Sequence, residues 1–511
     1  MLAKVLSFSV FGIDGYKVEI ETDITQGLPK RIIVGLPDMA VKESAERIRS
    51  AMGNSGFFYP ARRIVINLAP ADVKKEGTVF DLPIALGILA ANEQLKVIPE
   101  RLERFAFIGE LALDGKVRRV SGCLPMAIAC RAEGLRGIVV PRENADEAGI
   151  VKGIDVYPVD NLVDATRLLV QEELPPPHRT DVDALFRQTV LKYDLDYAEV
   201  KGQEAAKRAM CVAAAGGHNI LMIGPPGAGK TMLAERLPSI LPPLSFDEAL
   251  ETTKIHSVAG VLSEGLIAVR PFRAPHHSVS DVAMIGGGSY PRPGEVSLGH
   301  NGVLFLDEMA EFPRKTLEGM RLPLESGHVV ISRAAATIRY PAEFMLVCAT
   351  NPCPCGYYGD SRKECRCSPF QIQNYMARIS GPLLDRIDIH IEVASVAYRD
   401  LRDERQTESS EQIREKVMRA REIQRRRFEG TGITLNARMN TKLIKKHCRL
   451  AGEAEEMLGQ AMRQLALSAR AYSRILKVAR TIADLDGAAE LSAAHVSEAI
   501  QYRALDRKFW L

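Results

Sequence analysis

The octapeptide GPPGAGKT, from Gly224 to Thr231, has residue types and a spacing suited to binding phosphate groups. It fits the pattern G-x-x-x-x-G-K-[ST], the P-loop, in which glycines let backbone N–H groups turn toward an anion. In this pattern the lysine, Lys230, reaches the β- and γ-phosphates, and the hydroxyl group of Thr231 is a ligand of Mg²⁺. The residues predicted to surround the phosphates are Gly224, Pro225, Pro226, Gly227, Ala228, Gly229, Lys230 and Thr231.

Further polar side chains follow two apolar runs later in the chain. Asp307 and Glu308 come after VLFL, and Asn351 ends the run AEFMLVCATN. We expect Asp307 to share the Mg²⁺ ion with Thr231, and Glu308 to orient and deprotonate the attacking water. We expect Asn351 to position that water against the γ-phosphate. Together with the P-loop, these residues predict hydrolysis of ATP with Mg²⁺ as the cofactor.

A cluster of cysteines comes directly after Asn351, as two Cys-x-Cys pairs. Three interpretations are open: a structural Cys₄ zinc site, reduced thiols without a metal, and redox or Fe–S chemistry. Zinc is favoured because so small a loop has no core of its own, although Cys-x-Cys is tighter than the usual ligand spacing. The clustered cysteines are Cys353, Cys355, Cys365 and Cys367. The scattered ones, expected to be buried or inert, are Cys123, Cys130, Cys211, Cys348 and Cys448.

The length and composition limit the class of protein that carries these residues. A chain of 511 residues is too long for one core, and 46% hydrophobic with 26% charged residues is typical of a soluble protein. No apolar run reaches the roughly 18 residues of a membrane span, and the first residues lack the layout of a signal peptide. We therefore expect a cytoplasmic protein with reduced thiols. A net charge of +3 neither predicts nor excludes nucleic acid, so any basic surface must be local.

The elements that must position these side chains are those of an α/β protein. RRIVINL and RGIVV are predicted strands, and LPIALGILAANEQL is a predicted helix, all before the proline-rich stretch EELPPPHRT. After it, the P-loop is expected between a strand and a helix, and the last part of the chain is helical and charged. The predicted domains are residues 1–170, a linker at 171–190, an ATPase core at 191–396 and a helical lid at 397–511.

The order of the motifs resembles that of AAA+ ATPases, in the branch of magnesium chelatases and replicative helicases. P-loop, LFLDE, ATNP and GPLLDRIDI carry this resemblance. NLAPADVKKEGTVFDLPIALGIL, RPFRAPHHSVSD, NPCPCGYYGD and SARAYSRILKVARTIADL are more specifically similar to the ComM/YifB family. The resemblance covers nearly the whole chain. It implies a hexameric, ATP-hydrolysing DNA helicase that drives branch migration on single-stranded or branched DNA during natural transformation.

The same resemblance assigns roles to residues outside the P-loop. Arg386 in LLDRIDI matches an arginine finger that reaches the γ-phosphate in a neighbouring subunit, which offsets charge developing on the phosphoryl group. Arg470 matches a sensor at the start of a lid helix, with Arg474 one turn later as the alternative. The residues that match the segment packing on the adenine are Val200, Gly202 and Gln203.

The N-terminal region resembles the Lon-type protease fold but departs from it at both catalytic positions. TVFDLPIA stands where that protease has its nucleophilic serine, and SGCLPM, near Leu124, stands where it has its lysine base. A Ser–Lys dyad needs both partners within hydrogen-bonding reach. The resemblance therefore implies an α/β domain without proteolysis, reused for assembly or DNA contact.

Several segments are candidates for DNA contact. The long connection that contains APHHSVSD and the hairpin GHVVISRAAATIRY match pore-facing insertions, with Arg333 and Arg339 available to track phosphates. His276 and His277 are expected to be neutral and hydrogen-bonded rather than metal ligands. A basic helical run is expected to be an ordinary solvated face; its arginines are Arg419, Arg421, Arg425, Arg426 and Arg427.

The phosphate chemistry is common to three functions, so the sequence leaves them open. They are a ring-forming DNA motor, a chelatase-like remodeller of a protein partner, and a regulatory ATPase that is not a motor. We favour the DNA motor. The predicted fold is a multidomain α/β protein with a Lon-protease-like α/β N-terminal domain, an AAA+ P-loop αβα core and a C-terminal helical lid.

Overall fold

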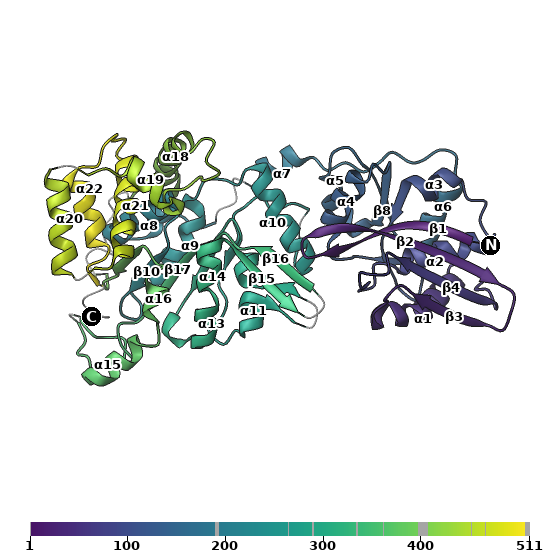
Figure 1. Ribbon diagram of the computed structural model, residues 1–511, viewed down its shortest axis with the longest axis horizontal. Coiled ribbons are helices and arrows are strands. Elements are labelled where there is room, and N and C mark those ends of the chain that lie inside the picture. Colours follow the sequence, from purple (N-terminus) through teal and green to yellow (C-terminus); the bar gives the residue numbers. More distant parts are fainter. Residues whose placement is uncertain are drawn as a thin grey trace. The chain divides into compact units, whose positions relative to one another are not determined.

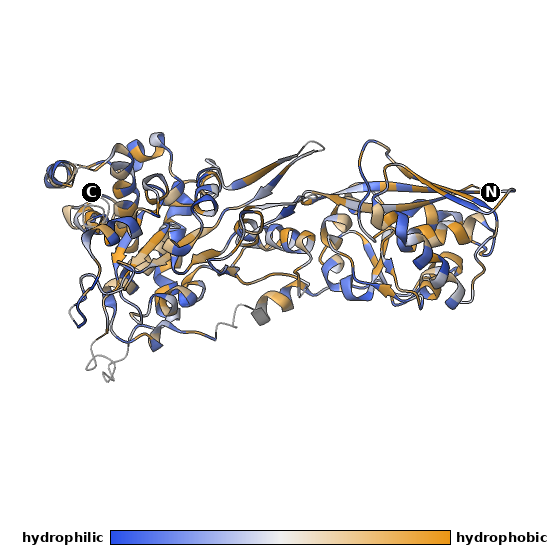
Figure 2. Ribbon diagram, turned by 90° about the horizontal axis from the view of Figure 1, so that it is seen from below, coloured by the Kyte–Doolittle hydropathy of each residue, from blue (hydrophilic) through white to orange (hydrophobic). Residues whose placement is uncertain are grey.

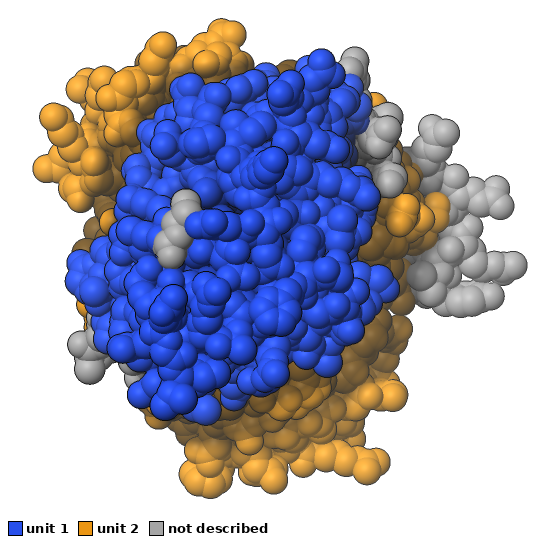
Figure 3. Space-filling view, turned by 90° about the vertical axis from the view of Figure 1, so that its right-hand side faces the viewer, with its two compact units in different colours: residues 1–189, 246–268 blue, residues 190–245, 269–511 orange. Residues whose placement is uncertain are grey.

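The structure is a computed structural model with two compact units, which Figure 3 distinguishes by colour. Unit 1 consists of Met1–Thr189 and Phe246–Ala268, and unit 2 of Val190–Ser245 and Val269–Leu511. Residues 246–268 lie within the range predicted for the ATPase core, yet they belong to the N-terminal unit. The residues that the structure describes are 2–189, 194–263, 265–288, 291–333, 336–360, 362–396, 407–450, 452–465 and 467–505, without the side chains of 187–189, 333 and 336.

Unit 1 is built on a seven-stranded mixed sheet in the order β3-β4-β2-β1-β5-β8-β9 (Figure 1). β1 and β2 form a long antiparallel hairpin, paired from Leu2↔Asp23 to Phe11↔Asp14, and Gly12 turns the chain with φ +66°. RRIVINL and RGIVV form β4 and β8, as predicted. The strands of this sheet are β1 (Leu2–Phe11), β2 (Asp14–Thr25), β3 (Lys30–Val34), β4 (Arg63–Ala69), β5 (Phe105–Phe107), β8 (Gly137–Pro141) and β9 (Asp155–Val159). A two-stranded sheet pairs β6 (Glu110–Leu111) with β7 (Val117–Arg118).

The helices of unit 1 include a central one that is apolar all round. Every residue of α2 is buried, because α2 packs against β1 and β2 on one side and against α1 on another. This is the helix predicted from LPIALGILAANEQL. α10 comes from the inserted residues 246–268 and packs against α4. The helices are α1 (Met39–Asn54), α2 (Asp81–Ala91), α3 (Pro99–Arg104), α4 (Cys123–Ala132), α5 (Ala145–Gly149), α6 (Leu162–Val170), α7 (Val182–Thr189) and α10 (Phe246–Ala259).

The proline-rich stretch lies against unit 1. His178 forms a β-bridge with Val156, and its ring contacts Asp146 at 2.8 Å. The Thr180 hydroxyl donates to the Asp146 carbonyl at 2.7 Å. Polar residues that follow the prolines thus fasten this stretch to the domain before it, and the division between the units falls at Thr189.

Unit 2 contains a five-stranded parallel sheet in the order β11-β14-β17-β10-β18. Its inner strands are apolar, as the hydropathy colours of Figure 2 show, and their residues are buried, which is typical of a parallel sheet covered on both faces. The P-loop follows β10, Asp307 follows β14 and Asn351 follows β17, so these residues share one edge of the sheet. The strands are β10 (Ile220–Ile223), β11 (Phe272–Arg273), β14 (Val303–Leu306), β17 (Met345–Thr350) and β18 (Ile389–Glu392).

Two small hairpins and many helices complete unit 2. The hairpins pair β12 (Gly286–Gly287) with β13 (Arg292–Pro293), and β15 (His328–Arg333) with β16 (Ala336–Pro341). α18 packs against α8 and α9, and α21 packs against α8, so the C-terminal helices share a core with the ATPase sheet. The helices are α8 (Glu204–Gly216), α9 (Lys230–Ile240), α11 (Asp281–Ile285), α12 (Glu295–Leu298), α13 (Arg314–Gly319), α14 (Arg321–Ser326), α15 (Pro369–Met376), α16 (Gly381–Leu384), α18 (Ser410–Arg427), α19 (Thr441–His447), α20 (Glu453–Gln464), α21 (Ala469–Leu485) and α22 (Ala493–Gln501).

The prediction of a mixed α/β chain with a parallel, P-loop-bearing sheet is confirmed. Within the part of the chain that the structure describes, no helix is long and apolar enough to cross a membrane.

Candidate active site

The P-loop is shaped by the sheet edge from which it emerges. The Gly224 amide donates to the carbonyl of Thr350 at 3.2 Å, which ties the start of the loop to the neighbouring strand β17. Gly227 and Gly229 have φ of +76° and +90°, a backbone conformation that only glycine adopts without strain. These two residues turn the loop so that its last amides continue into the N-terminus of α9, where anions are stabilised.

Lys230 lies at the base of this loop with its side chain nearly buried. Its Nζ donates to the carbonyls of Gly224 at 2.6 Å and Pro225 at 3.0 Å, and to Oδ1 of Asn351 at 3.2 Å. Burial lowers the pKa of Lys230, while the charges of Asp307 and Glu308 act in the opposite direction. The structure thus brings together the lysine and the asparagine predicted to flank the γ-phosphate.

Thr231 and Asp307 meet across the same edge. The Thr231 hydroxyl donates to Oδ2 of Asp307 at 2.7 Å, although the two residues are far apart in sequence. Hydroxyl and carboxylate oxygens are the donors that Mg²⁺ prefers. The pair fits the predicted Mg²⁺ ligands.

Glu308 projects from the end of β14 in an unusual conformation. Its φ is +49°, and its side chain is 56% exposed. Nδ1 of His277 lies 3.6 Å from its Oε2, and the His277 ring meets Phe312 edge-on. His276 contacts the Ser278 hydroxyl at 2.8 Å. That His277 lies beside Glu308 was not predicted from the sequence, because the two residues follow different strands, β11 and β14.

The segment predicted to pack on the adenine lies next to the P-loop. Val200 is buried, and Gly202 and Gln203 have φ of +64° and +59°. The Gln203 amide donates to the carbonyl of Ala228 at 3.1 Å. These residues therefore join the segment before α8 directly to the phosphate loop.

Arg386 lies at the opposite edge of the sheet. β18 runs parallel to β10, paired from Ile220↔Ile389 to Ile223↔Glu392, so the residues before β18 lie beside the start of β10 and not beside the P-loop. The Asn219 side chain, just before β10, donates to the Arg386 carbonyl at 2.9 Å. Four strand residues, about 13 Å, separate this edge from the P-loop.

Both sensor candidates also lie at that opposite edge. Nε of Arg474 is 3.1 Å from Asp388, whereas Nη1 of Arg470 is 3.6 Å from Asp385. The Arg474 side chain is 16% exposed and that of Arg470 is 66% exposed. The structure therefore separates Arg386, Arg470 and Arg474 from the P-loop and groups them with one another.

Arg386 and Arg474 line a pocket of about 250 Å³ that is richer in positive than in negative side chains. Four lining residues are cationic and two are anionic, a net charge of +2. Burial lowers the pKa of Arg474 and of Lys477. Nη1 of Arg474 and Nε of Arg386 are buried without a hydrogen-bond partner. The charged lining residues are Arg386, Arg438, Arg474, Lys477, Glu325 and Asp388.

Two of these cations, Arg438 and Lys477, were not predicted. The Lys477 ammonium donates to the carbonyl of Ala437 at 2.8 Å, beside Arg438. Asp388 holds the pocket together: burial by itself would raise its pKa, but the hydrogen bond with His218 and the charges of Arg474 and Lys477 lower it. No sequence motif marks these residues, because they come from separate helices and turns that meet only in the fold.

The four clustered cysteines come together directly beyond Asn351. Their sulfur atoms all lie within 4.8 Å of one another, and three of the separations are 3.4, 3.7 and 3.6 Å. A tetrahedral zinc site with Zn–S bonds of about 2.3 Å has sulfur atoms about 3.8 Å apart. The four thiols therefore fit zinc. All nine cysteines are free, and burial raises the pKa of Cys211 to about 11 and of Cys448 to about 12, which leaves these scattered thiols inert as expected.

The long connection predicted to contact DNA contains the β12–β13 hairpin, which lies against the predicted β15–β16 hairpin. The Tyr340 hydroxyl donates to the Pro291 carbonyl at 2.7 Å, and β12 contacts β15. Arg292 and Arg339 are exposed on them, and Arg339 also contacts Nδ1 of His328 at 3.1 Å. The side chain of Arg333 lies outside the described residues.

The basic run on α18 has partners both on its own helix and on other helices of unit 2. Arg421 donates to the Ala214 carbonyl at 2.6 Å, and Arg427 pairs with the buried Asp484. Arg425 and Arg426 both pair with Glu422. Arg419 is exposed. Arg419, Arg425 and Arg426 thus form the solvated face that was predicted, whereas Arg421 and Arg427 bind α18 to neighbouring helices.

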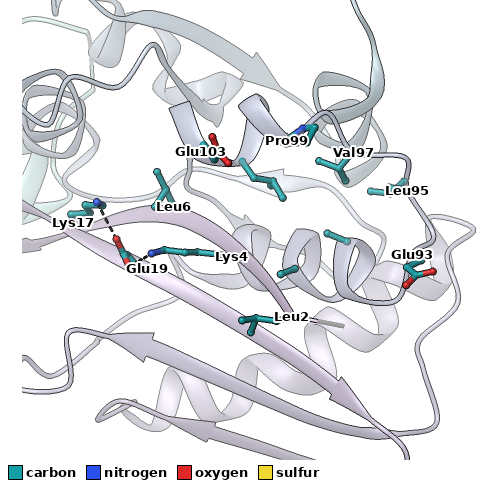
Figure 4. Close-up of a pocket in the computed structure, with 13 residues that line it drawn as sticks. Leu2, Lys4, Leu6, Lys17, Glu19, Glu93, Leu95, Val97, Pro99 and Glu103 are labelled. Carbon is teal, nitrogen blue, oxygen red and sulfur yellow. Dashed lines mark ion pairs between the residues drawn. The ribbon is translucent and has the colours of Figure 1, made fainter.

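Figure 4 shows a cavity in unit 1. None of the described residues that line this cavity is a predicted site residue. The cavity, of about 580 Å³, is lined largely by apolar side chains such as Leu2, Leu6 and Val97. Its lysines, Lys4 and Lys17, are both paired with Glu19, at 2.5 and 3.1 Å. The stretch TVFDLPIA, where Lon has its serine, contains no serine, and Leu124, near the position of the lysine base, is apolar and buried.

Known protein families and relatives match nearly the whole length of the chain. Residues 196–401 match the family described as magnesium chelatase, subunit ChlI; residues 20–144 and 407–503 match two further ChlI families, the second being its C-terminal part. Competence protein ComM of Haemophilus influenzae is 46% identical over 508 residues, which cover 99% of this chain and 98% of ComM.

The chain belongs to the ComM/YifB family of magnesium-chelatase-like AAA+ proteins. YifB of Escherichia coli is 44% identical over 511 residues, with 99% of this chain and 98% of YifB covered. Lon protease of Finegoldia magna is 28% identical over 139 residues, or 26% of this chain and 17% of Lon. Membership in this AAA+ family indicates an ATPase, and the Lon likeness is limited to a part of the chain.

Proposed function

We propose that the protein is a ring-forming AAA+ motor that couples ATP hydrolysis to movement on single-stranded or branched DNA. The edge of the sheet that carries the P-loop, Asp307, Glu308 and Asn351, called the phosphate edge below, supplies the chemistry. Lys230 binds the β- and γ-phosphates, Glu308 deprotonates the attacking water, and Asn351 holds that water in line. Mg²⁺, held by Thr231 and Asp307, would neutralise charge on the phosphates. Val200, Gly202 and Gln203 would face the adenine.

The observation that carries the ring is the position of Arg386 at the edge opposite the P-loop. An arginine about 13 Å of strand away cannot reach a phosphate bound by its own P-loop. It can reach one bound by a neighbour when copies associate head to tail, which is the arrangement that closes into a ring. We infer that Arg386 and Arg474 act on the neighbour's nucleotide, and that Arg470 is less suited because its side chain is largely exposed. The family resemblance favours six copies.

The DNA assignment is supported by the paired hairpins and by a relative. The β12–β13 and β15–β16 hairpins present Arg292 and Arg339, which would contact phosphates without reading sequence. ComM, nearly half identical over the full length, is named a competence protein. We propose branch migration during uptake or recombination of DNA, in the cytoplasm, with the Lon-like domain serving assembly or DNA contact and the C-terminal helices forming the lid.

A chelatase-like remodeller of a protein partner is the alternative, because the ChlI families match the same residues. The two functions differ in what stimulates hydrolysis. The steady-state ATPase rate of the full chain would be measured alone, with linear single strands and with a three-strand junction, using Glu308→Gln as the hydrolysis-deficient control. Stimulation by DNA together with strand displacement supports the motor. A robust rate that no DNA changes refutes it and favours a protein partner.

A further inference from the structure

The end of β17 and the four-cysteine loop that follows it contact the P-loop at three points. The Thr350 carbonyl accepts from the Gly224 amide at 3.2 Å, and Asn351 accepts from Lys230 at 3.2 Å. The third contact is one of packing. A Cβ atom on Gly356 would lie 2.6 Å from Cδ of Pro226, so the Gly356 main chain lies against the Pro226 ring and leaves no room for a side chain.

Apart from the cysteines, the described part of this loop is held by main-chain turn hydrogen bonds and by side-chain contacts of Arg362 and Lys363. The described residues between β17 and α15 form neither helix nor strand, and among the four cysteines only Cys353 is buried. A loop of this kind has too little apolar area to fix its own conformation. Its conformation nevertheless decides where Gly356 lies, and Gly356 has a φ of +84° that depends on the turn from Cys353.

The environment of the sulfur atoms is that of a structural zinc site. The amides of Gly356 and Tyr358 donate to the Cys353 sulfur, and those of Tyr357 and Arg366 to the Cys355 sulfur. Amide donors of this kind stabilise metal-bound thiolates and fix their direction. Four thiolates at tetrahedral separations leave no open position, so the site is closed to substrate. An iron–sulfur or redox site would not require the contact between Gly356 and Pro226, so this contact favours neither of them.

We propose that the four cysteines bind one Zn²⁺ and that this zinc site braces the P-loop, so that the affinity for nucleotide depends on zinc. Zinc fixes the turn from Cys353 to Gly356, and Gly356 in turn supports Pro226 and the amides that follow it. Without the metal the loop loses its shape, and the P-loop loses the surface on which it rests. The inference rests on the proposed binding of ATP at the P-loop, but not on any action on DNA.

The test uses the full chain, purified under reducing conditions, with zinc counted by atomic emission and nucleotide affinity measured with a fluorescent ADP analogue and Mg²⁺. We expect one zinc per chain. Cys365→Ser should lose the zinc and raise the Kd for ADP on the order of tenfold. Cys448→Ser, at a buried cysteine outside the cluster, should retain both zinc and affinity.

A second variant separates the brace from the metal. Gly356→Ala inserts a methyl group against Pro226 and should weaken nucleotide binding while the zinc remains bound. Gly430→Ala is its matched control, because Gly430 has a φ of +75° and nothing within 4 Å of its Cβ position; its affinity should not change. Wild-type protein without zinc would overturn the metal site. Zinc loss in Cys365→Ser at unchanged Kd would overturn the brace.

The proposed function can fail separately. A protein that binds the ADP analogue in a zinc-dependent way but hydrolyses ATP at a rate indifferent to DNA would refute the DNA motor and leave the brace intact. A wild-type chain that binds zinc but no nucleotide would refute both the proposed ATPase and the brace.

Discussion

Two inactive variants should restore activity to each other if Arg386 acts on the neighbouring subunit. Lys230→Ala destroys the P-loop of its own chain but leaves Arg386 intact. Arg386→Ala keeps its P-loop but removes the arginine from the opposite edge, and we expect it to hydrolyse ATP roughly 10³-fold more slowly than wild type. On this hypothesis each catalytic site takes its P-loop from one copy and its arginine from the next, because the two lie at opposite ends of β10 and β18.

The geometry fixes the size of the effect. In an equal, randomly exchanged mixture, the P-loop is intact in half of the copies, and half of their neighbours supply Arg386. About a quarter of the sites are then complete, so the mixture should reach about a quarter of the wild-type rate when sites act independently. The assay is steady-state phosphate release, measured after the two proteins have been dissociated into single subunits by dilution, mixed and reassembled together.

A second mixture provides the control. Lys230→Ala and Glu308→Gln alter the same edge of the same chain, so no neighbour can complete either site and the mixture should stay inactive. If the first mixture is also no more active than its parents, Arg386 does not act between subunits, and the argument from the parallel register of β10 and β18 is wrong.

Three further changes have expected outcomes. His277→Ala should lower kcat about 3- to 10-fold without changing nucleotide affinity, because the Glu308 carboxylate loses the ring 3.6 Å away that limits its orientation, whereas His276→Ala should match wild type. Burial raises the pKa of Asp81 to about 6 despite its pairing with Arg47, so the folded chain binds this proton more tightly than the unfolded chain, and stability falls as pH rises from about 4 to 6. In Asp81→Asn the free energy of unfolding, measured with urea, should fall less over this pH range than in the wild type, by on the order of 1–3 kcal/mol. Parallel plots of this free energy against pH for the two proteins would contradict the prediction. Gly15→Ala should lower stability by about 1–3 kcal/mol, because its Cβ would lie 2.4 Å from the Pro125 carbonyl, while Gly53→Ala, with nothing within 4 Å, should not; equal urea midpoints would show that the strand can move.

The phosphate edge could be predicted because its residues occur in short motifs tied to apolar strands. In a parallel sheet the residues that follow the strands meet at one edge, so Lys230, Asp307 and Asn351 had to lie near one another once β10, β14 and β17 were identified. The same reasoning identified β4, β8 and α2 from hydrophobic runs alone. Local pattern and local structure agree at all of these positions.

Other features depend on contacts between distant segments and could not be read from the chain. Residues 246–268 belong to unit 1 because α10 packs against α4, and no change of composition marks that segment in the sequence. The charged pocket needs α21, η4 (Asn436–Arg438) and the turn before β18 to meet, so Arg438 and Lys477 carried no signal. His277 was judged from its neighbours in sequence, while its partner Glu308 comes from another strand.

If copies assemble head to tail as proposed, the separation of the two edges leaves each subunit with a nucleotide site that it cannot complete alone. Holding four cations close to only two anions is unfavourable unless a further negative group enters the pocket, since like charges in a partly desolvated pocket repel one another. A terminal phosphate carries about the charge that the pocket lacks. In the proposed ring, the charge of the pocket is therefore balanced at the moment when a neighbouring copy presents its nucleotide. Assembly and ATP binding should stabilise each other for this reason, and the charge balance of the pocket links them in the same way whether the ring moves DNA or a protein.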